Sequence, residues 1–158
     1  MSEVVTTQGQ IALVTGASRG IGRAIAAALA AQGMKVIGTA TTEAGAAAIG
    51  EALAARGGSG LKLDVTDAAA LDAAIDAIVK QHGGLHVLVN NAGITRDTLA
   101  MRMKDEDWDA VLDTNLKAVF RASPPSTLPG PHSTRCVTPR ACMACTVSTQ
   151  RTGPKAWR

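Results

Sequence analysis

The fold of this chain is decided by residues 11–22, which read IALVTGASRGIG. The apolar run at the start is typical of a strand buried on both faces, and the first glycine marks the end of that strand. Residues 21–32 follow with many alanines and with the apolar spacing of a helix. The stretch therefore predicts a buried parallel strand that turns sharply into a helix.

The alternation of strand and helix continues to about residue 122. Short apolar runs predict further strands at 36–39, 61–65 and 86–90, and helical spacing predicts helices over 43–56, 67–81 and 104 to about 122. The apolar positions of the last two helices are Leu71, Ile75, Ile78 and Val79, then Trp108, Val111, Leu112 and Leu116. Right-handed crossovers place such helices on both faces of a parallel sheet. We therefore expect an α/β chain, the N-terminal half of a doubly wound Rossmann sheet, with strand order 3-2-1-4.

Two compositions divide the 158 residues, which suffice for one domain. Residues 1–122 hold all 13 acidic residues against 11 lysines and arginines, a net charge of −2. Residues 123–158 carry +5, no acid, all six prolines and all three cysteines, without strand or helix periodicity. We expect an NADP-binding half-domain at 1–122 and a disordered basic tail at 123–158. The switch falls inside a predicted helix, which is typical of translation out of frame.

The composition of this tail also predicts that the sheet has an exposed edge strand. No apolar run after Phe120 predicts a fifth strand, so strand 86–90 is expected to be an edge and the stripe around Leu116 to lack a packing partner.

Targeting signals are not evident. Residues 1–10 lack the basic and apolar regions of a secretory signal, and the longest apolar run, 24–31, is too short to span a membrane. Three cysteines make a disulfide framework improbable for a reducing compartment. The sequence thus predicts a cytoplasmic protein that does not associate with membranes.

The turn after the first strand has the glycine spacing G-x-x-x-G-x-G. Gly16 can make the tight turn, Gly20 lets backbone approach a pyrophosphate, and Gly22 permits close helix packing. The N-terminus of the following helix offers free N–H groups to phosphate. The turn therefore predicts dinucleotide binding, and the alternative is that the glycines only make a sharp strand-to-helix connection.

Two features favour NADP(H) over NAD(H). Residues 39–42 at the end of the second strand are uncharged and Glu43 already begins a helix, so no acid is positioned for a ribose 2′-hydroxyl. Arg19, in the glycine turn, can pair with a 2′-phosphate. The alternative for Arg19 is a solvated turn residue.

The motifs TGASRGIG at 15–22 and NNAG at 90–93 together resemble the classical short-chain dehydrogenase/reductases. Residues 38–41, 91–97 and 102–108 are similar to the bacterial 3-oxoacyl-[acyl-carrier-protein] reductases within that family. The resemblance covers residues 1–122. It implies an oxidoreductase of fatty-acid biosynthesis that uses NADPH to reduce a 3-oxoacyl group on acyl carrier protein, in a homo-oligomer.

The resemblance also implies roles for particular residues. Asp64 and Val65 would flank the adenine, Asn91 would tie the fourth strand to the sheet beside the ribose, and Asn115 would serve catalysis by holding a water in a proton relay. Otherwise, Asp64 is a turn former, Asn91 a turn residue and Asn115 a polar residue on an exposed helix face. The residues implied to bind the cofactor are Gly16, Ala17, Ser18, Arg19, Gly20, Ile21, Gly22, Thr41, Asp64, Val65, Asn91, Ala92 and Gly93.

The chemistry that the family requires is incomplete in these residues. The 158 residues contain no tyrosine, so the serine and Tyr-x-x-x-Lys arrangement of the family is missing and we expect no activity. His132 and Lys155 are the other candidates for a proton donor, and neither lies on a predicted element. Alternatives are a non-catalytic NADP-binding or interaction module, or a tail that binds nucleic acid or holds zinc through His132, Cys136, Cys142 and Cys145.

Overall fold

The computed structural model describes residues 7–123 and 135–137, and its centre is a parallel sheet. The central strand β1 (Ile11–Val14) pairs with β2 (Lys35–Ala40) on one side and with β4 (Val87–Val89) on the other. The strand β3 (Ser59–Lys62) pairs with β2, also in parallel. The predicted order 3-2-1-4 is therefore confirmed.

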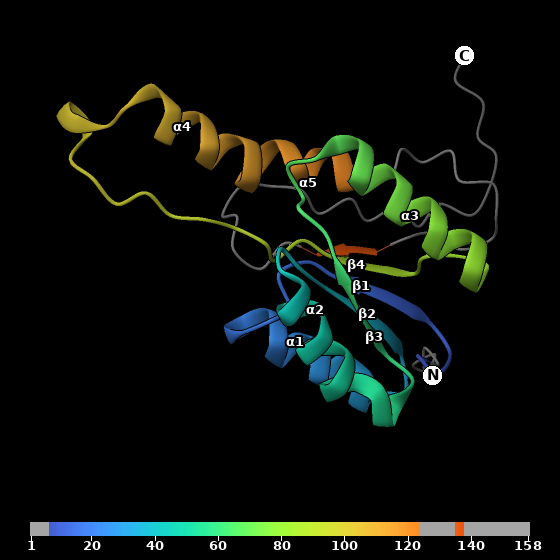
Figure 1. The fold of residues 1–158 in the computed structure, drawn as a ribbon. Coiled ribbons are helices and arrows are strands. Elements are labelled where there is room, and N and C mark those ends of the chain that lie inside the picture. The colour runs from blue at the N-terminus through green and yellow to red at the C-terminus, as the bar shows by residue number, and fades with distance from the viewer. Residues whose placement is uncertain (1–6, 124–134, 138–158) are drawn as a thin grey trace, which may run out of the picture.

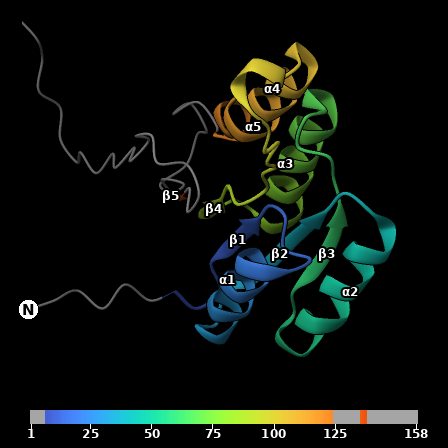
Figure 2. The same cartoon turned by 90° about the vertical axis from the view of Figure 1, so that its left-hand side faces the viewer.

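Helices cover both faces of this sheet (Figures 1 and 2). On one face lie α1 (Gly20–Ala31) and α2 (Glu43–Leu53), the latter continued by the short 3-10 turn η1 (Ala54–Arg56). On the other lie α3 (Ala68–His82), α4 (Asp105–Leu112) and α5 (Ala118–Ala122). This is the doubly wound arrangement that the sequence predicts.

The alternation of side chains along β1 divides the core between the two faces. Ala12 and Val14 belong to the apolar cluster under α1 and α2, whereas Ile11 and Leu13 belong to the cluster under α3. Both clusters are built from residues that are at most 9% exposed. Leu71, Ile75 and Ile78 of α3 are buried in the second cluster, as their spacing predicts. Since β1 is buried on both faces, its unbroken apolar sequence is required.

One strand differs in position from its prediction. The sequence predicted a strand over 61–65, but β3 ends at Lys62. Beyond it, the Asp64 carboxylate accepts hydrogen bonds from the Thr66 N–H and hydroxyl at 2.9 and 2.7 Å, which closes a turn. This turn forms in place of further strand pairing, because an aspartate carboxylate readily accepts a hydrogen bond from the backbone N–H two residues later in the chain.

The prediction that β4 is an edge strand of the sheet is wrong. Residues Arg135–Val137 form a fifth strand, β5, that pairs in parallel with Val87–Val89. An edge strand offers unpaired N–H and C=O groups to any extended backbone, whatever the side-chain pattern of the incoming segment. Apolar periodicity therefore could not reveal β5. The rest of the predicted disordered tail lies outside the described residues.

The predicted helix over 104–122 is continuous but not uniform. Between α4 and α5 it contains a π-helical turn, η3 (Asp113–Lys117). A preceding 3-10 turn, η2 (Ala100–Arg102), belongs to the segment that reaches out beyond the sheet, yellow in Figure 1. In the predicted stripe, Trp108, Leu112 and Leu116 are 55%, 37% and 61% exposed, whereas Val111 is partly buried.

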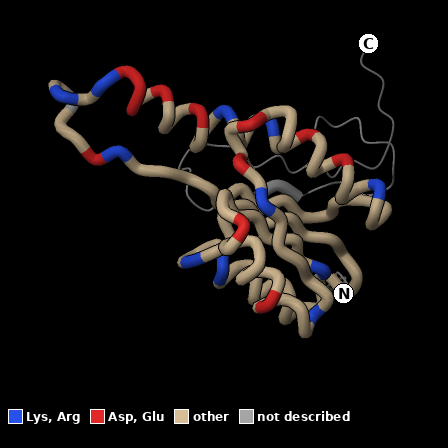
Figure 3. The backbone as a smooth tube through the Cα atoms, viewed as in Figure 1, with Lys and Arg blue, Asp and Glu red and all other residues tan. Residues whose placement is uncertain are grey.

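Charged side chains lie mainly on the helices and loops, and the sheet is nearly free of them (Figure 3). Within residues 7–123 and 135–137, no helix has the length and apolar character needed to cross a membrane. The same ranges contain no cluster of three or more histidine, cysteine or acidic side chains suited to a metal ion.

Candidate functional site

A cavity of about 830 Å³ opens where the parallel strands β1 to β4 end. Ligands of open α/β sheets bind at this edge, where crossovers diverge to opposite faces. The walls combine the turn after β1 with the ends of β2, β3 and β4 and one residue of η3. The lining residues are Gly16, Ser18, Arg19, Gly20, Ile21, Gly22, Ala40, Thr41, Asp64, Val65, Thr66, Asn91, Ala92, Gly93, Ile94, Thr95, Arg96 and Thr114.

The glycine turn is shaped by close backbone contacts. A Cβ on Gly22 would lie 2.3 Å from both the Gly16 carbonyl oxygen and the Asn91 Nδ2 atom. Gly16 and Gly20 have positive φ angles of 65° and 58°, which side chains rarely adopt. A Cβ on Gly20 would meet nothing within 4 Å, so backbone is exposed to the cavity there. The turn is therefore a cradle built from bare backbone.

The N-terminus of α1 differs from those of α2 and α3. Thr42 caps α2 by accepting a hydrogen bond from the Gly45 N–H, and Asp67 caps α3 by accepting from the Ala70 N–H. Arg19, at the same position of α1, makes no side-chain cap, and the first turn of α1 holds no acid. The N–H groups and positive dipole end of α1 are thus left to a ligand that carries negative charge.

Arg19 is exposed at the mouth of the turn, and within the described ranges its guanidinium has no ion-pair partner. The other charged lining residues are Asp64 and Arg96. The Asp64 carboxylate accepts a hydrogen bond from the Thr66 hydroxyl, and the Arg96 Nε lies 3.3 Å from Asp107 Oδ1 of α4. Thr41, at the end of β2, is exposed to the cavity and carries no charge. Of the two lining residues Arg19 and Thr41, Arg19 is cationic and neither is acidic.

Asn91 fastens the glycine turn to β4. Its Nδ2 donates to the carbonyl oxygens of Thr15 and Gly16, both at 3.0 Å, and the residue is 9% exposed. The Thr15 hydroxyl in turn accepts from the N–H groups of Asn91 and Ala92 at 3.0 Å. These contacts join the segment after β4 to the end of β1 and to the glycine turn.

Asn115 belongs to a second tie, from η3 to the loop after β4. Its Oδ1 accepts from the Ile94 N–H at 2.9 Å, and its Nδ2 donates to the Ile94 carbonyl at 2.8 Å. A Cβ on Gly93 would lie 3.1 Å from Oδ1, so glycine lets the loop pass closely. The alternative of a polar residue on an exposed helix face does not hold, because both ends of the amide are bonded. The π-helical turn that holds Asn115 is a feature often found at functional sites.

All but two of the residues predicted for the site line the cavity. Ala17 is buried behind it, where its N–H donates to the Thr39 carbonyl at 2.9 Å. Asn115 lies next to the lining residue Thr114. His132, Cys142, Cys145 and Lys155 lie outside the described residues, and Cys136 is described only as backbone of β5.

Several lining residues were missed by the sequence reasoning. Ile94, Thr95 and Arg96 directly follow the NNAG motif, so extending that motif would have found them. Thr66 could have been inferred from Asp64, because an Asp two residues before a Thr at a strand end is a turn signal. Ala40 and Thr114 carry no comparable signal.

Known proteins share sequence and fold with this chain. A family model described as short chain dehydrogenase matches residues 10–125. The 3-oxoacyl-[acyl-carrier-protein] reductase FabG of Escherichia coli K12 is 60% identical over 116 residues, 73% of this chain and 47% of the relative. The enzyme of the same name from Pseudomonas aeruginosa PAO1 is 50% identical over 121 residues, which are 75% of this chain and 49% of the relative.

A solved structure shares the fold. It is described as a short-chain alcohol dehydrogenase from Sinorhizobium meliloti 1021, with a TM-score of 0.69 and 40% identity over 73% of this chain and 47% of that one. The chain thus spans about half the length of the relatives it matches. Because the family model covers most of the chain, and the glycine turn and NNAG motif it contains form one cavity, the chain belongs to the short-chain dehydrogenase family of oxidoreductases.

Proposed function

We propose that the cavity binds NADP(H). The observation that carries the proposal is the uncapped N-terminus of α1 behind a turn of bare backbone, which leaves N–H groups for a pyrophosphate. The cavity lies at the strand ends where α/β folds hold dinucleotides. Gly16, Ser18, Gly20, Ile21 and Gly22 would hold the phosphates, with Ala17 supporting the turn from behind.

The remaining lining residues would hold the two nucleosides. Thr41 and Arg19 would face the 2′-phosphate, and Asp64 and Val65 would flank the adenine. Asn91, Ala92 and Gly93 would contact the ribose on the nicotinamide side, and the Thr15 hydroxyl fixes the N–H groups of Asn91 and Ala92. NADPH, when bound, would supply a hydride.

The reaction we propose for the family site is reduction of a 3-oxoacyl group to a 3-hydroxyacyl group on acyl carrier protein. The FabG relatives, which carry this activity in their names, are 50–60% identical to this chain over its matched part. In that reaction Asn115 would act beside the reacting group. Its amide fixes the Ile94 backbone and so the cavity wall after Gly93.

Replacement of Arg19 tests the cofactor preference. We expect NADPH to bind more tightly than NADH to the parent chain, and Arg19→Ala to raise the Kd for NADPH about tenfold, because a charge-assisted contact to phosphate is lost. The Kd for NADH should hardly change. The measurement is nucleotide fluorescence titration, with Arg23→Ala on the outer face of α1 as the control. Equal affinities of the parent chain for NADH and NADPH would contradict the proposed preference.

Binding alone does not complete the reaction in these 158 residues. Reduction of a ketone needs a proton donor within hydrogen-bond reach of the oxygen, and the sequence contains no tyrosine to supply it. The residues proposed above would bind a cofactor, and none of them is proposed to polarise a carbonyl. We therefore expect the purified 158-residue chain to bind NADPH without oxidising it when a 3-oxoacyl thioester is added.

An NADPH oxidation assay checks this expectation. Turnover that survives Asn115→Ala and disappears with His132→Ala would contradict it, because the proton donor would then come from residues 123–158. Binding without turnover would leave the non-catalytic NADP-binding module as the function of this chain. That second candidate is favoured by the same absence of tyrosine.

A further inference from the structure

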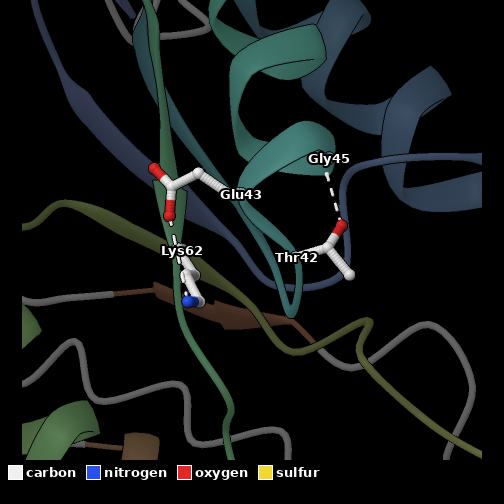
Figure 4. A network of polar contacts seen from close by, with 4 residues as sticks. All are labelled: Thr42, Glu43, Gly45 and Lys62. Carbon is white, nitrogen blue, oxygen red and sulfur yellow. Dashed lines mark hydrogen bonds and ion pairs between the residues drawn. The ribbon is translucent and has the colours of Figure 1, made fainter.

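A pair of opposite charges borders the proposed NADP(H) site, on whose existence this inference rests. Lys62 is the last residue of β3 and Glu43 is the first residue of α2. The Lys62 Nζ lies 3.9 Å from the Glu43 Oε2 (Figure 4). The two side chains are 59% and 84% exposed, so each is free to take another direction if its partner is removed.

Lys62 stands immediately behind the wall of the cavity. It pairs with Ala40 in the register between β2 and β3, and Ala40 lines the cavity. A strand places alternate residues on the same face. Gly60 faces α2, since a Cβ there would lie 1.8 Å from the Ala46 carbonyl oxygen, and Lys62 shares that face. Its ammonium group is thereby directed to the first turn of α2.

That first turn borders the adenosine end of the cavity. Gly45 packs there closely, and a Cβ on it would lie 2.8 Å from the Ala40 Cβ and 3.6 Å from the Ser18 Cβ. Thr42 caps the helix through the Gly45 N–H at 3.1 Å, which fixes the position of Glu43 (Figure 4). Glu43 is thus the first carboxylate after β2, two residues from the lining residue Thr41.

A carboxylate close to this point affects the choice of nucleotide. In NAD-binding folds an acid after the second strand accepts the hydrogen bond of the ribose 2′-hydroxyl, and the same charge repels a 2′-phosphate. In the structure Glu43 is paired with Lys62 and does not line the cavity. The ion pair thus holds the acid of the first turn of α2, which stands two residues after Thr41, against β3.

We propose that Lys62 is a specificity-determining residue, which holds the Glu43 carboxylate against β3 and offsets its charge so that Glu43 does not oppose the binding of a 2′-phosphate by Arg19. Arg19 supplies the attraction, and Lys62 removes the repulsion. Loss of Lys62 should therefore shift the preference from NADP(H) toward NAD(H) without any change in the phosphate cradle.

The test is a double-mutant cycle on the full 158-residue chain, with Kd values for NADPH and NADH measured by fluorescence at low salt. Lys62→Met should raise the Kd for NADPH about threefold and leave that for NADH equal or lower, the size expected for an exposed charge pair. Glu43→Gln alone should change little, and Lys62→Met combined with Glu43→Gln should return the parent preference. Lys62→Arg should keep it.

The matched control is Lys80→Met, the same change in charge and shape in the last turn of α3. Lys80 is twelve residues along α3 from Ala68, about 18 Å at the rise of a helix. Lys80→Met should not alter the Kd for NADPH or the Kd for NADH. Thermal unfolding of each variant shows whether it is folded before the constants are compared.

The outcomes separate this inference from the function on which it rests. A parent chain that binds neither nucleotide overturns both. A preference for NADPH that Arg19→Ala removes and Lys62→Met leaves intact supports the site and overturns the role of Lys62. If Lys62→Met loses the preference and the double variant does not recover it, Lys62 contacts the phosphate itself and the role assigned to Glu43 is wrong.

Discussion

Gly22→Ala is expected to abolish NADPH binding and to destabilise the fold by about 3 kcal/mol, the upper range for a forced overlap in a packed site. The added Cβ would lie 2.3 Å from the Gly16 carbonyl oxygen and from Asn91 Nδ2. Neither is the flexible end of a side chain, because the first is backbone and the second is fixed by two hydrogen bonds. The start of α1 must therefore move away from the turn, and its N–H groups move with it.

Gly50→Ala is the matched control for this substitution. Gly50 is also a helical glycine, in α2, and a Cβ there would meet only the Gly60 nitrogen, at 3.6 Å. Alanine has the higher helix propensity, so Gly50→Ala should be neutral or stabilising by about 0.5–1 kcal/mol. Urea unfolding and NADPH titration measure both variants. If the Gly22→Ala variant binds NADPH as tightly as the parent chain, the turn is not the phosphate cradle.

Asn91→Ala is expected to lower the free energy of unfolding by about 3 kcal/mol, because it removes two hydrogen bonds and leaves two carbonyls without their donor. Those carbonyls belong to Thr15 and Gly16, at the point where β1 enters the glycine turn. Domain stabilities are small differences between large terms, so a loss of this size is a large fraction of the total. Chemical denaturation followed by circular dichroism measures it.

Asn91→Asp and Asn115→Ala distinguish hydrogen bonding from shape. Aspartate has the size of asparagine but cannot donate, so Asn91→Asp should be at least as destabilising as Asn91→Ala. Asn115→Ala leaves the contact between β1 and β4 intact and frees only the Ile94 backbone. It should therefore cost less in unfolding and act mainly on the loop after β4. Parent-like stability of Asn91→Asp would contradict the role given to Nδ2.

The strand and helix order was predictable because each element is encoded locally. The run at 11–14 is apolar throughout, as a strand covered on both faces must be, and the apolar residues of α3 repeat with helical spacing. The glycines at 16, 20 and 22 could be assigned to the sharp turn between β1 and α1, because Gly16 and Gly20 have positive φ and Gly22 packs too closely for a side chain, whereas phosphate binding by this turn stays a prediction. NADP(H) as ligand stays a prediction from these same residues.

The predictions failed or were incomplete where a distant segment decides the outcome. β5 forms because the edge of β4 accepts backbone from residues 135–137, whose side chains give no strand pattern. β3 ends early because the Asp64 carboxylate binds Thr66 instead of leaving its backbone to the sheet. In both cases hydrogen bonding of the backbone, which hydrophobic periodicity does not report, sets the boundary.

The sequence by itself determined the parallel order of the sheet, the position of the glycine turn and the absence of a tyrosine, since these depend on residue type and on short spacing. Only the tertiary structure decided which groups meet across the chain. Asn91 reaches back to Thr15 and Gly16, Asn115 closes on Ile94, and Lys62 pairs with Glu43, over separations of 19 to 76 residues. Such contacts are fixed by the packing of helices on a twisted sheet, because side-chain chemistry alone does not specify a partner so far along the chain.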